Sequence, residues 1–379
     1  MTETDRLKGL ADRLLLEGTL PPEDLRSLLL HHDGQGADYL HGLARQTARK
    51  HFGNRIFIRG LVEIGNCCHN DCLYCGIRRS NRHVERYRLD RQTILECCRT
   101  GYEMGFRTFV LQGGEDPWMD DERTATLVSC LRQAFPDAAI TLSLGEKTVE
   151  AYRRFFEAGA NRYLLRHETH NPAHYALLHP ASMSLDHRLH CLEELKRIGY
   201  QTGTGIMVGS PGQTADHLVE DIRFIHDFRP HMIGIGPFIP HHDTPFAHEP
   251  AGSVELTLRL ISIFRLMHPA ALIPATTALA SLSPDGRERG ILAGANVVMP
   301  NLSPLHSRAK YALYDNKASL GAEAAEGLAL LDRRLAAIGY RIDKGRGDYD
   351  NNRRAGCHTS EDTTGIEAHD LKTDILCIK

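Results

Sequence analysis

The sequence lacks the features that would place it in a membrane, a fibrous or a disordered class. No apolar run approaches the roughly 20 residues that a membrane-spanning helix needs. The formal net charge is only -3, so no overall charge favours nucleic acid or an anionic membrane. The polar opening MTETDRLKGLADR does not resemble a secretory signal. We therefore expect a cytoplasmic globular protein, with neither nucleic acid nor a membrane among its partners.

The length and composition fit one large domain with additions at its ends. The chain has 379 residues, of which 42% are hydrophobic and 25% are charged. Residues 1–50 carry amphipathic patterns and predict an N-terminal helical segment. Residues 306–349 predict a C-terminal helical extension. Residues 350–379 show no periodicity, so we expect a mobile tail there.

Between residues 51 and 305, apolar strands alternate with helical patterns. Seven helical segments separate eight strand candidates, which is the pattern of a (β/α)8 barrel. The strand candidates are residues 56–65, 108–114, 139–145, 162–169, 202–209, 231–239, 271–277 and 296–301. Such apolar strands form a parallel sheet covered by helices, for which a doubly wound open sheet is the alternative. We predict the α/β class and a TIM-type (β/α)8 barrel with N-terminal helices and a short C-terminal helical extension.

A cluster of cysteines follows the first predicted strand. Cys68, Cys72 and Cys75 have the spacing C-x3-C-x2-C, at the strand end where such barrels hold their active sites. Three thiolates this close can each hold one corner of a cubane iron–sulfur cluster, which leaves the fourth iron open. A zinc ribbon would need a second C-x2-C pair, which the sequence does not have. Structural thiols or an adventitious metal site are the alternative, and neighbouring Cys67 is interpreted as a bystander.

The other cysteines suggest no chemistry. Cys97, Cys98, Cys130 and Cys191 fall in predicted helices, where cysteine behaves as a small apolar residue. Cys357 and Cys377 lie in the tail without a partner motif. Disulfides are not expected, because no export signal is recognised.

Several motifs together resemble the radical S-adenosylmethionine (SAM) superfamily. An aromatic residue, Tyr74, precedes the last cysteine, and Gly113-Gly114-Glu115 ends the second predicted strand. Further motifs lie at nearly every predicted strand end. They are DCLYCGIRRSN, LQGGEDP, TLSLGEK, RYLLRHETHNP, GIMVGSPGQT, IGIGPFIPHHDTP, IPATT and GANVVMPN. Over about residues 50–305 the chain is similar to the HydE family of [FeFe]-hydrogenase maturases, whose close relatives are methylornithine synthase and biotin synthase.

This resemblance implies roles for individual residues. Cys68, Cys72 and Cys75 would hold one [4Fe-4S] cluster. SAM would be bound by Tyr74, Gly113, Gly114, Glu115, Glu168, Arg188 and Met207. Of these, Arg188 would pair with its carboxylate, Glu168 would bind its ribose, and Tyr74 and Met207 would lie near its adenine. Substrate contacts inside the barrel would be Gln112, Thr141, Ser143, Arg166, Thr276 and Thr277. Members of the family often carry an auxiliary cluster on three cysteines after the barrel. The stretch YALYDNKASLGAEAAEG has none, so we predict no auxiliary cluster.

The resemblance also implies a reaction and partners. The enzyme would reductively cleave SAM to a 5′-deoxyadenosyl radical during assembly of the di-iron subcluster of the hydrogenase H-cluster. Its substrate would be a small sulfur-bearing iron complex, an iron–cysteine carbonyl/cyanide species. A ferredoxin- or flavodoxin-type donor would supply the electron, and other hydrogenase maturases would be partners. A methylornithine synthase-like mutase and a biotin synthase-like enzyme are the alternatives. Biotin synthase needs cluster cysteines on barrel strands, and here the extra cysteines fall in predicted helices.

Several other patterns allow a second interpretation. PHHDTP contains His241, His242 and Asp243, which form a metal corner or, as we favour, shape a turn. Arg166 either contacts substrate or forms an ion pair inside the barrel. A non-catalytic electron-transfer protein is also possible, but such a protein normally ligates its cluster with four protein groups.

Overall fold

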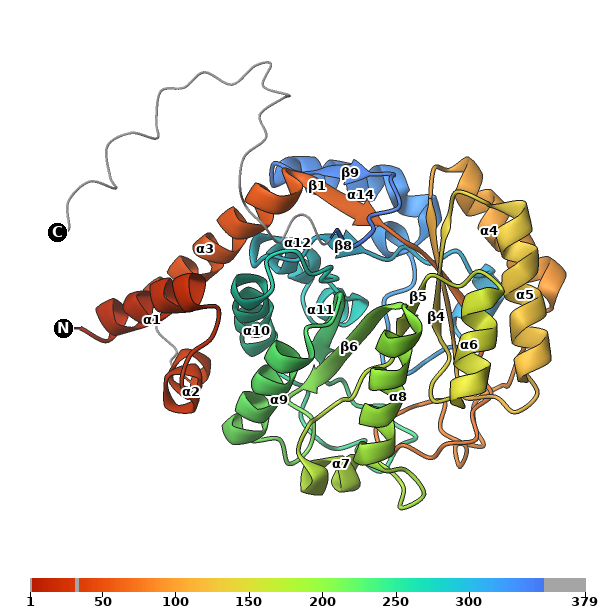
Figure 1. Ribbon diagram of the computed structural model, residues 1–379, viewed down its shortest axis with the longest axis horizontal. Helices are drawn as coiled ribbons and strands as arrows, with labels where there is room; N and C mark the ends of the chain where they lie inside the picture. The colour runs from red at the N-terminus through yellow and green to blue at the C-terminus, as the bar shows by residue number, and fades with distance from the viewer. Residues whose placement is uncertain (1, 31–33, 351–379) are drawn as a thin grey trace.

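Parallel strands form a ring in the computed structural model, which describes residues 2–30 and 34–350 (Figure 1). The strands are β1 (Arg55–Ile58), β2 (Gly60–Gly65), β3 (Thr108–Gly113), β4 (Ala139–Ser143), β5 (Arg162–Leu164), β6 (Gln201–Val208), β7 (Met232–Pro237), β8 (Val297–Val298) and β9 (Arg341–Asp343). Strands β2 to β7 form one parallel sheet in sequence order. β8 pairs in parallel with β1, which continues directly into β2.

Single bridges complete the ring between β7 and β8. Met232 bridges Leu272, and Pro274 bridges Val297, so the segment predicted as the seventh strand lies in the ring without forming a full strand. Proline has no N–H to donate, which limits pairing at this position. The predicted (β/α)8 barrel is therefore confirmed, and the doubly wound open sheet is excluded.

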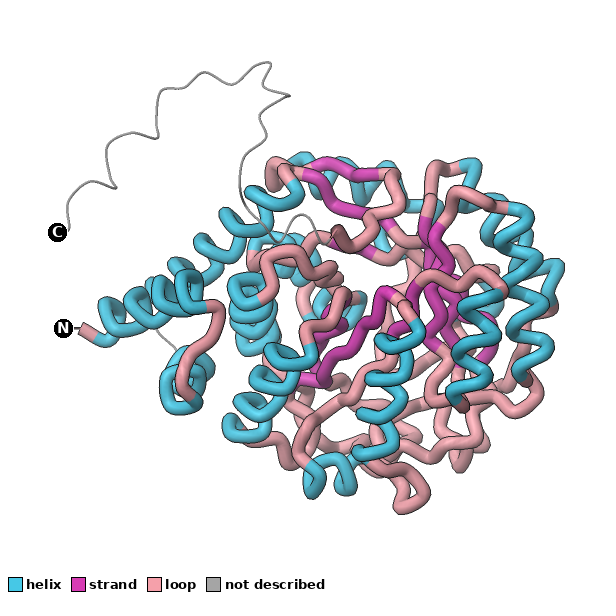
Figure 2. The backbone as a smooth tube through the Cα atoms, in the orientation of Figure 1, coloured by secondary structure: helices cyan, strands magenta, loops and turns pink. Residues whose placement is uncertain are grey.

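Helices cover the outside of the ring and extend from it on one side (Figures 1 and 2). They are α1 (Glu3–Glu17), α2 (Pro22–Leu30), α3 (Gly34–Phe52), α4 (Arg91–Glu103), α5 (Asp121–Ala134), α6 (Val149–Glu157), α7 (Pro172–Leu178), α8 (Leu185–Ile198), α9 (Ala215–Phe228), α10 (Val254–Met267), α11 (Thr277–Leu282), α12 (Gly286–Leu292), α13 (Leu305–Arg308) and α14 (Leu328–Ala337), with 3-10 turns η1 (Gly321–Glu323) and η2 (Ala325–Gly327). None of the described helices is long and apolar enough to cross a membrane.

Capping side chains fix where the outer helices begin. Asp90, Asp120, Thr148, Ser184 and Thr214 each accept a hydrogen bond from the backbone N–H three residues later. Such a bond satisfies one of the N–H groups that a helix start leaves free. These caps fix the first residues of the outer helices; α5, α6 and α9 begin soon after β3, β4 and β6, whereas long loops precede α4 and α8.

The register of the sheet determines which side chains face the interior of the barrel. Residues in register across parallel strands share a face, and alternate residues along one strand change faces. Glu63, Gln112 and Ser143 are in register on β2, β3 and β4, near the carboxyl ends of the strands. On β6 and β7, Gly205 and Gly234 are in register on this inner face. A Cβ on Gly205 would lie 1.7 Å from the carbonyl oxygen of Gly234, so glycine allows the close approach of these two strands.

The last described strand lies beside the first. β9 pairs in parallel with β1, from Arg55 with Arg341 to Phe57 with Asp343, and Figure 2 shows the two strands side by side. The residues that follow β9 lie against the amino ends of barrel strands. Buried Arg162 donates to the carbonyl of Arg346 at 2.9 Å and to Asp348 at 2.8 Å. The sequence predicted only helix in this extension, so β9 was missed. Residues 351–379, with Cys357 and Cys377, lie outside the described residues.

Candidate functional site

The cysteine loop, residues 66–90, follows β2, and one arginine side chain binds several of its backbone carbonyls. The guanidinium of Arg86 donates to four carbonyls, those of Asn66, Ile77, Arg78 and Asn81, at 2.6 to 2.9 Å. Arg86 therefore fixes the path of a loop that has little regular secondary structure. Sequence reasoning missed this residue, because a backbone-binding arginine leaves no motif.

The Gly113-Gly114-Glu115 turn at the end of β3 packs directly on the cysteine loop. A Cβ added to Gly114 would lie 2.3 Å from the carbonyl oxygen of Cys67 and 2.7 Å from the Cβ of Cys68. The backbone N–H of His69 donates to the carbonyl of Glu115 at 2.9 Å. Only glycine allows this approach, so the turn after β3 lies in direct contact with the first cysteine of the loop.

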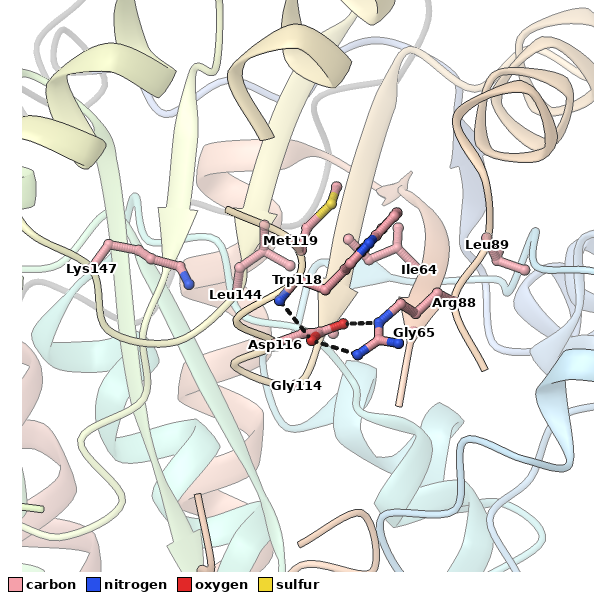
Figure 3. Close-up of a pocket in the computed structure, with 11 residues that line it drawn as sticks. Ile64, Gly65, Arg88, Leu89, Gly114, Asp116, Trp118, Met119, Leu144 and Lys147 are labelled. Atoms are coloured by element: carbon pink, nitrogen blue, oxygen red, sulfur yellow. Dashed lines mark hydrogen bonds and ion pairs between the residues drawn. The ribbon is translucent and has the colours of Figure 1, made fainter. Parts of the chain in front are cut away.

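The turn after β3 is also held by contacts around a small pocket on its side away from Cys68 (Figure 3). Arg88 makes two bonds to the carboxylate of Asp116, at 2.5 and 3.0 Å, and its guanidinium lies over the ring of Trp118. The pocket is lined by Ile64, Gly65, Arg88, Leu89, Gly113, Gly114, Asp116, Trp118, Met119, Leu144 and Lys147. The pair between Arg88 and Asp116 thus joins the cysteine loop to the turn after β3.

The three thiols are each partly buried in the same loop. Burial raises the pKa of Cys68, raises that of Cys75 to about 12 and raises that of Cys72 well above the usual value. Negative charge on Cys68 and Cys75 raises the pKa of Cys72 further, so the three sulfurs lie within electrostatic reach of one another. Such thiols stay protonated unless a cationic group displaces the protons.

The spacing of the thiols fits a group with several metal centres. Among residues 2–30 and 34–350, the group of three ligands whose donor atoms all lie within 4.8 Å is His241, His242 and Asp315. The three cysteines are not such a group, so they are spread more widely than the ligands of one ion. A cubane cluster accepts each thiolate on a different iron, which matches this arrangement.

Arg188 on α8 reaches the same region and is paired in the structure. Its Nε donates to Glu146 at 2.5 Å, and its Nη1 donates to the carbonyl of Arg166 at 3.0 Å. It is also within electrostatic reach of Cys72 and Glu115. The residue expected to bind the SAM carboxylate therefore lies near the thiols, and Glu146 is a partner that the sequence did not reveal.

Glu168 adopts a backbone conformation that is rare for a residue with a side chain. Its φ is +65°, its N–H donates to the carbonyl of Gly205 at 3.1 Å, and its carboxylate pairs with Arg166 at 2.5 Å. The strand predicted over 162–169 ends at Leu164, and Glu168 lies on the bend beyond it. Strain of this kind is common at functional sites.

Tyr74 and Met207 lie in a small apolar cluster near the barrel mouth. Met207 is buried together with Leu178 and Phe238, and the ring of Tyr74 packs against this cluster. The hydroxyl of Tyr74 is 3.2 Å from Nε2 of His179, a histidine not singled out in the sequence. The two residues expected to contact adenine therefore lie in one apolar cluster.

The residues expected to contact substrate come largely together. Gln112, Ser143 and Thr141 lie on the inner face of β3 and β4, and Arg166 lies within 3.8 Å of where a Cβ on Gly234 would stand. The hydroxyls of Thr141 and Thr276 are buried without a hydrogen-bond partner among the described residues. Thr277 differs, since its hydroxyl is bound to Glu323 at 3.2 Å.

The residues 309–318 form a strap across the mouth of the barrel. The carbonyl of Leu313 accepts from Gly76, Asp315 donates to the carbonyl of Pro240, and Ala318 donates to the hydroxyl of Ser281. The strap therefore touches the cysteine loop, the loop after β7 and helix α11. It also places Tyr311 and Lys317 beside the barrel interior, which the sequence did not predict.

The PHHDTP loop serves to hold this strap. His242 donates its backbone N–H to Asp315 at 3.0 Å, and its Nδ1 is 2.7 Å from the same carboxylate. The ring centroids of His241 and His242 are 4.4 Å apart, and Nδ1 of His241 accepts from the backbone N–H of Asp243 at 3.1 Å. These contacts favour the turn interpretation over a metal corner.

Comparison with known proteins shows similarity over most of the chain. Residues 62–225 match the family model described as the Radical SAM superfamily. The chain is 45% identical over 297 residues to the [FeFe] hydrogenase maturase subunit HydE of Thermotoga maritima, which covers 78% of this chain and 84% of that protein. It is 31% identical over 313 residues to 3-methylornithine synthase of Methanosarcina barkeri, covering 82% and 88%.

Solved structures agree on the architecture. The crystal structure of methylornithine synthase (PylB) matches with a TM-score of 0.78 at 29% identity, covering 88% of this chain and 97% of that one. The structure of HydG, a maturase of the [FeFe]-hydrogenase, matches with a TM-score of 0.74 at 20% identity, covering 90% and 76%. At that identity the second match supports the fold alone.

Proposed function

The chain belongs to the radical SAM superfamily, and within it to the HydE family of [FeFe]-hydrogenase maturases, and from this membership we propose its reaction and its site. It is a radical SAM enzyme of hydrogenase maturation. We propose that it cleaves SAM reductively during assembly of the di-iron subcluster of the H-cluster. The observation that supports this best is the loop of three partly buried thiols at the carboxyl ends of the barrel strands, against Gly114.

The residues present fit one cluster and one molecule of SAM. Cys68, Cys72 and Cys75 would hold the [4Fe-4S] cluster. SAM would be held by Tyr74, Gly113, Gly114, Glu115, Glu168, Arg188 and Met207. When bound, the cluster and SAM supply the one-electron cleavage that yields methionine and a 5′-deoxyadenosyl radical.

The protein contributes binding, orientation and the exclusion of water. The guanidinium of Arg188, buried and fixed by Glu146, is suited to grip a carboxylate through parallel hydrogen bonds. Glu168 on its rigid bend can accept hydrogen bonds from hydroxyl groups. The strap and the cysteine loop cover the mouth, so a reactive radical would meet few unintended hydrogen donors.

The cofactor content and partners remain part of the proposal. We propose a single cluster, because residues 302–350 contain no cysteine. A small sulfur-bearing iron complex would enter the interior lined by Gln112, Thr141, Ser143, Arg166 and Thr276, with Thr277 at its edge. A ferredoxin- or flavodoxin-type protein would supply the electron, and other hydrogenase maturases would be partners. An open iron is attacked by oxidants, so a reducing cytoplasm suits the enzyme.

A mutase of the methylornithine synthase type has weaker support. The identity to that relative is 31%, against 45% to HydE over a similar share of the chain. The biotin synthase alternative is weaker again, because Cys97, Cys98, Cys130 and Cys191 lie in α4, α5 and α8 rather than on barrel strands.

The central experiment tests the thiol loop. After anaerobic reconstitution and reduction, the wild type should form 5′-deoxyadenosine from SAM, and Cys72→Ala should not. Cys130→Ala, on the outer helix α5, is the matched control and should keep the activity. Absence of 5′-deoxyadenosine in the wild type would reject the whole assignment. Normal hydrogenase activity in a strain that lacks the gene would reject the role in maturation.

A further inference from the structure

Glu63 is a fully buried carboxylate on the inner face of the barrel. It lies on β2 in register with Gln112 and Ser143, and its side chain has 0% of its surface exposed. It stands five residues before Cys68, in an otherwise apolar strand. A buried carboxylate is costly unless its charge is balanced and its oxygens are hydrogen-bonded.

Lys317 of the strap balances the charge of Glu63. The Lys317 ammonium pairs with Oε1 of Glu63 and donates to the carbonyl of Tyr311 at 3.0 Å. The hydroxyl of Tyr311 accepts from Nε2 of Gln112 at 3.3 Å. The strap is therefore connected to two inward residues of neighbouring strands, and the carboxylate of Glu63 is kept in place as a hydrogen-bond acceptor.

The second oxygen of Glu63 has no partner among the described residues. Oε2 is buried and makes no hydrogen bond. The hydroxyls of Thr141 and Thr276, which also line the interior, are likewise buried without a partner among the described residues. Buried polar atoms are nearly always paired, so three such atoms in one interior indicate that a polar molecule completes them. An ionised carboxylate can only accept, so its partner must be a donor.

Charges of opposite sign lie near one tyrosine of the strap. The phenol of Tyr314 is within electrostatic reach of both Glu63 and Arg166, and Arg166 is also paired with Glu168. A carboxylate and a guanidinium match the ammonium and carboxylate of an amino acid group.

We propose that Glu63 is a substrate-binding residue whose Oε2 accepts a hydrogen bond from an amine of the substrate, and that Lys317 is the positioning residue that holds it. This inference rests on the proposed function, because it assumes that the barrel interior receives the substrate. It adds a specific contact to the proposed substrate: the amine of the amino acid group that the iron–cysteine complex carries is bound at Glu63.

A chemical double-mutant cycle tests the contact. The probes are the iron carbonyl/cyanide complex of cysteine and the matching complex of 3-mercaptopropionate, which lacks the amine. Their dissociation constants are measured for the cluster- and SAM-loaded wild type and for Glu63→Gln. Loss of the amine should weaken binding to the wild type by about tenfold or more and should have little effect in the variant. An equal loss in both proteins would overturn the inference.

Two further variants separate binding from folding. Glu63→Gln leaves the Lys317 charge without its partner, so Glu63→Gln/Lys317→Met, which removes both charges, is measured in the same cycle. Glu288→Gln makes the same chemical change at a buried ion pair on α12, outside the barrel, and should keep the amine preference. Loss of the amine preference in Glu288→Gln would overturn the inference. If the wild type forms no 5′-deoxyadenosine, the proposed function fails first, which distinguishes the two failures.

Discussion

Substitution of Gly114 by alanine should disrupt the cluster site through a steric effect alone. The new methyl group would lie 2.3 Å from the carbonyl oxygen of Cys67, where ordinary contact begins at 3.4 Å, so the two must separate by about 1 Å. The neighbour is backbone, which cannot rotate away, and the next residue carries the first thiol. Overpacking of this size costs about 1–3 kcal/mol. We expect the strain to move Cys68 and to lower the affinity for the cluster by about 5- to 150-fold, the factor that this energy range corresponds to.

The assay compares this variant with its neighbour. A methyl group on Gly113 would approach nothing closer than the 3.2 Å to Cγ1 of Ile64, a flexible side chain. Iron and sulfide content after anaerobic reconstitution should therefore fall strongly in Gly114→Ala and only slightly in Gly113→Ala. Full cluster content in Gly114→Ala, or equal losses in both variants, would refute the argument that close packing positions the thiol loop.

Three further predictions follow from other parts of the structure. Arg188→Gln should raise the Kd for SAM by about tenfold or more in equilibrium dialysis, while Arg154→Gln on the exposed face of α6 should not; an unchanged Kd would remove Arg188 from the site. Burial lowers the pKa of His167 and His179 to about 3 and of His41 and His174 to about 4, from about 6.5. The unfolded chain then binds more protons below pH 6.5, so the free energy of unfolding should fall as the pH is lowered from 6.5 toward 4; a flat profile in urea titrations would contradict this. Asp348→Asn should lower the stability by about 1–3 kcal/mol, because Arg162 is left buried without its partner although Asp348 itself is partly exposed; an unchanged Tm would show that the pair is not needed.

Much of the architecture is predictable from the sequence because barrel strands and helices have different periods. The apolar runs and the capping residues Asp90 and Asp120 mark where each unit begins. The seventh strand candidate was predicted from its place in the alternation of strands and helices, but Pro274 limits its pairing to single bridges. β9 was missed because Arg341 to Asp343 is too short and too polar to show alternation.

Site residues were predicted where they form local motifs. They were missed where folding brings together residues that are far apart in the chain. Cys68, Gly114 and Glu115 are recognised from local strings, and the structure places them in contact. Lys317 lies far from Glu63 in the chain, and only the folded strap brings the two charges together. Such long-range pairs have no signature in a single sequence. A charged residue inside an apolar strand, as at Glu63, is the one local signal that was available.

The pairing of β9 with β1 has a consequence for the order in which the molecule is made. β1 is the first strand to leave the ribosome, but its two neighbours, β8 and β9, are among the last described segments to be synthesised. Contacts between distant segments form slowly, since the intervening chain must first be closed into a loop. The amino end of the barrel therefore stays open until β9 has been synthesised. A chain truncated before Arg341 would leave one edge of β1 without its partner.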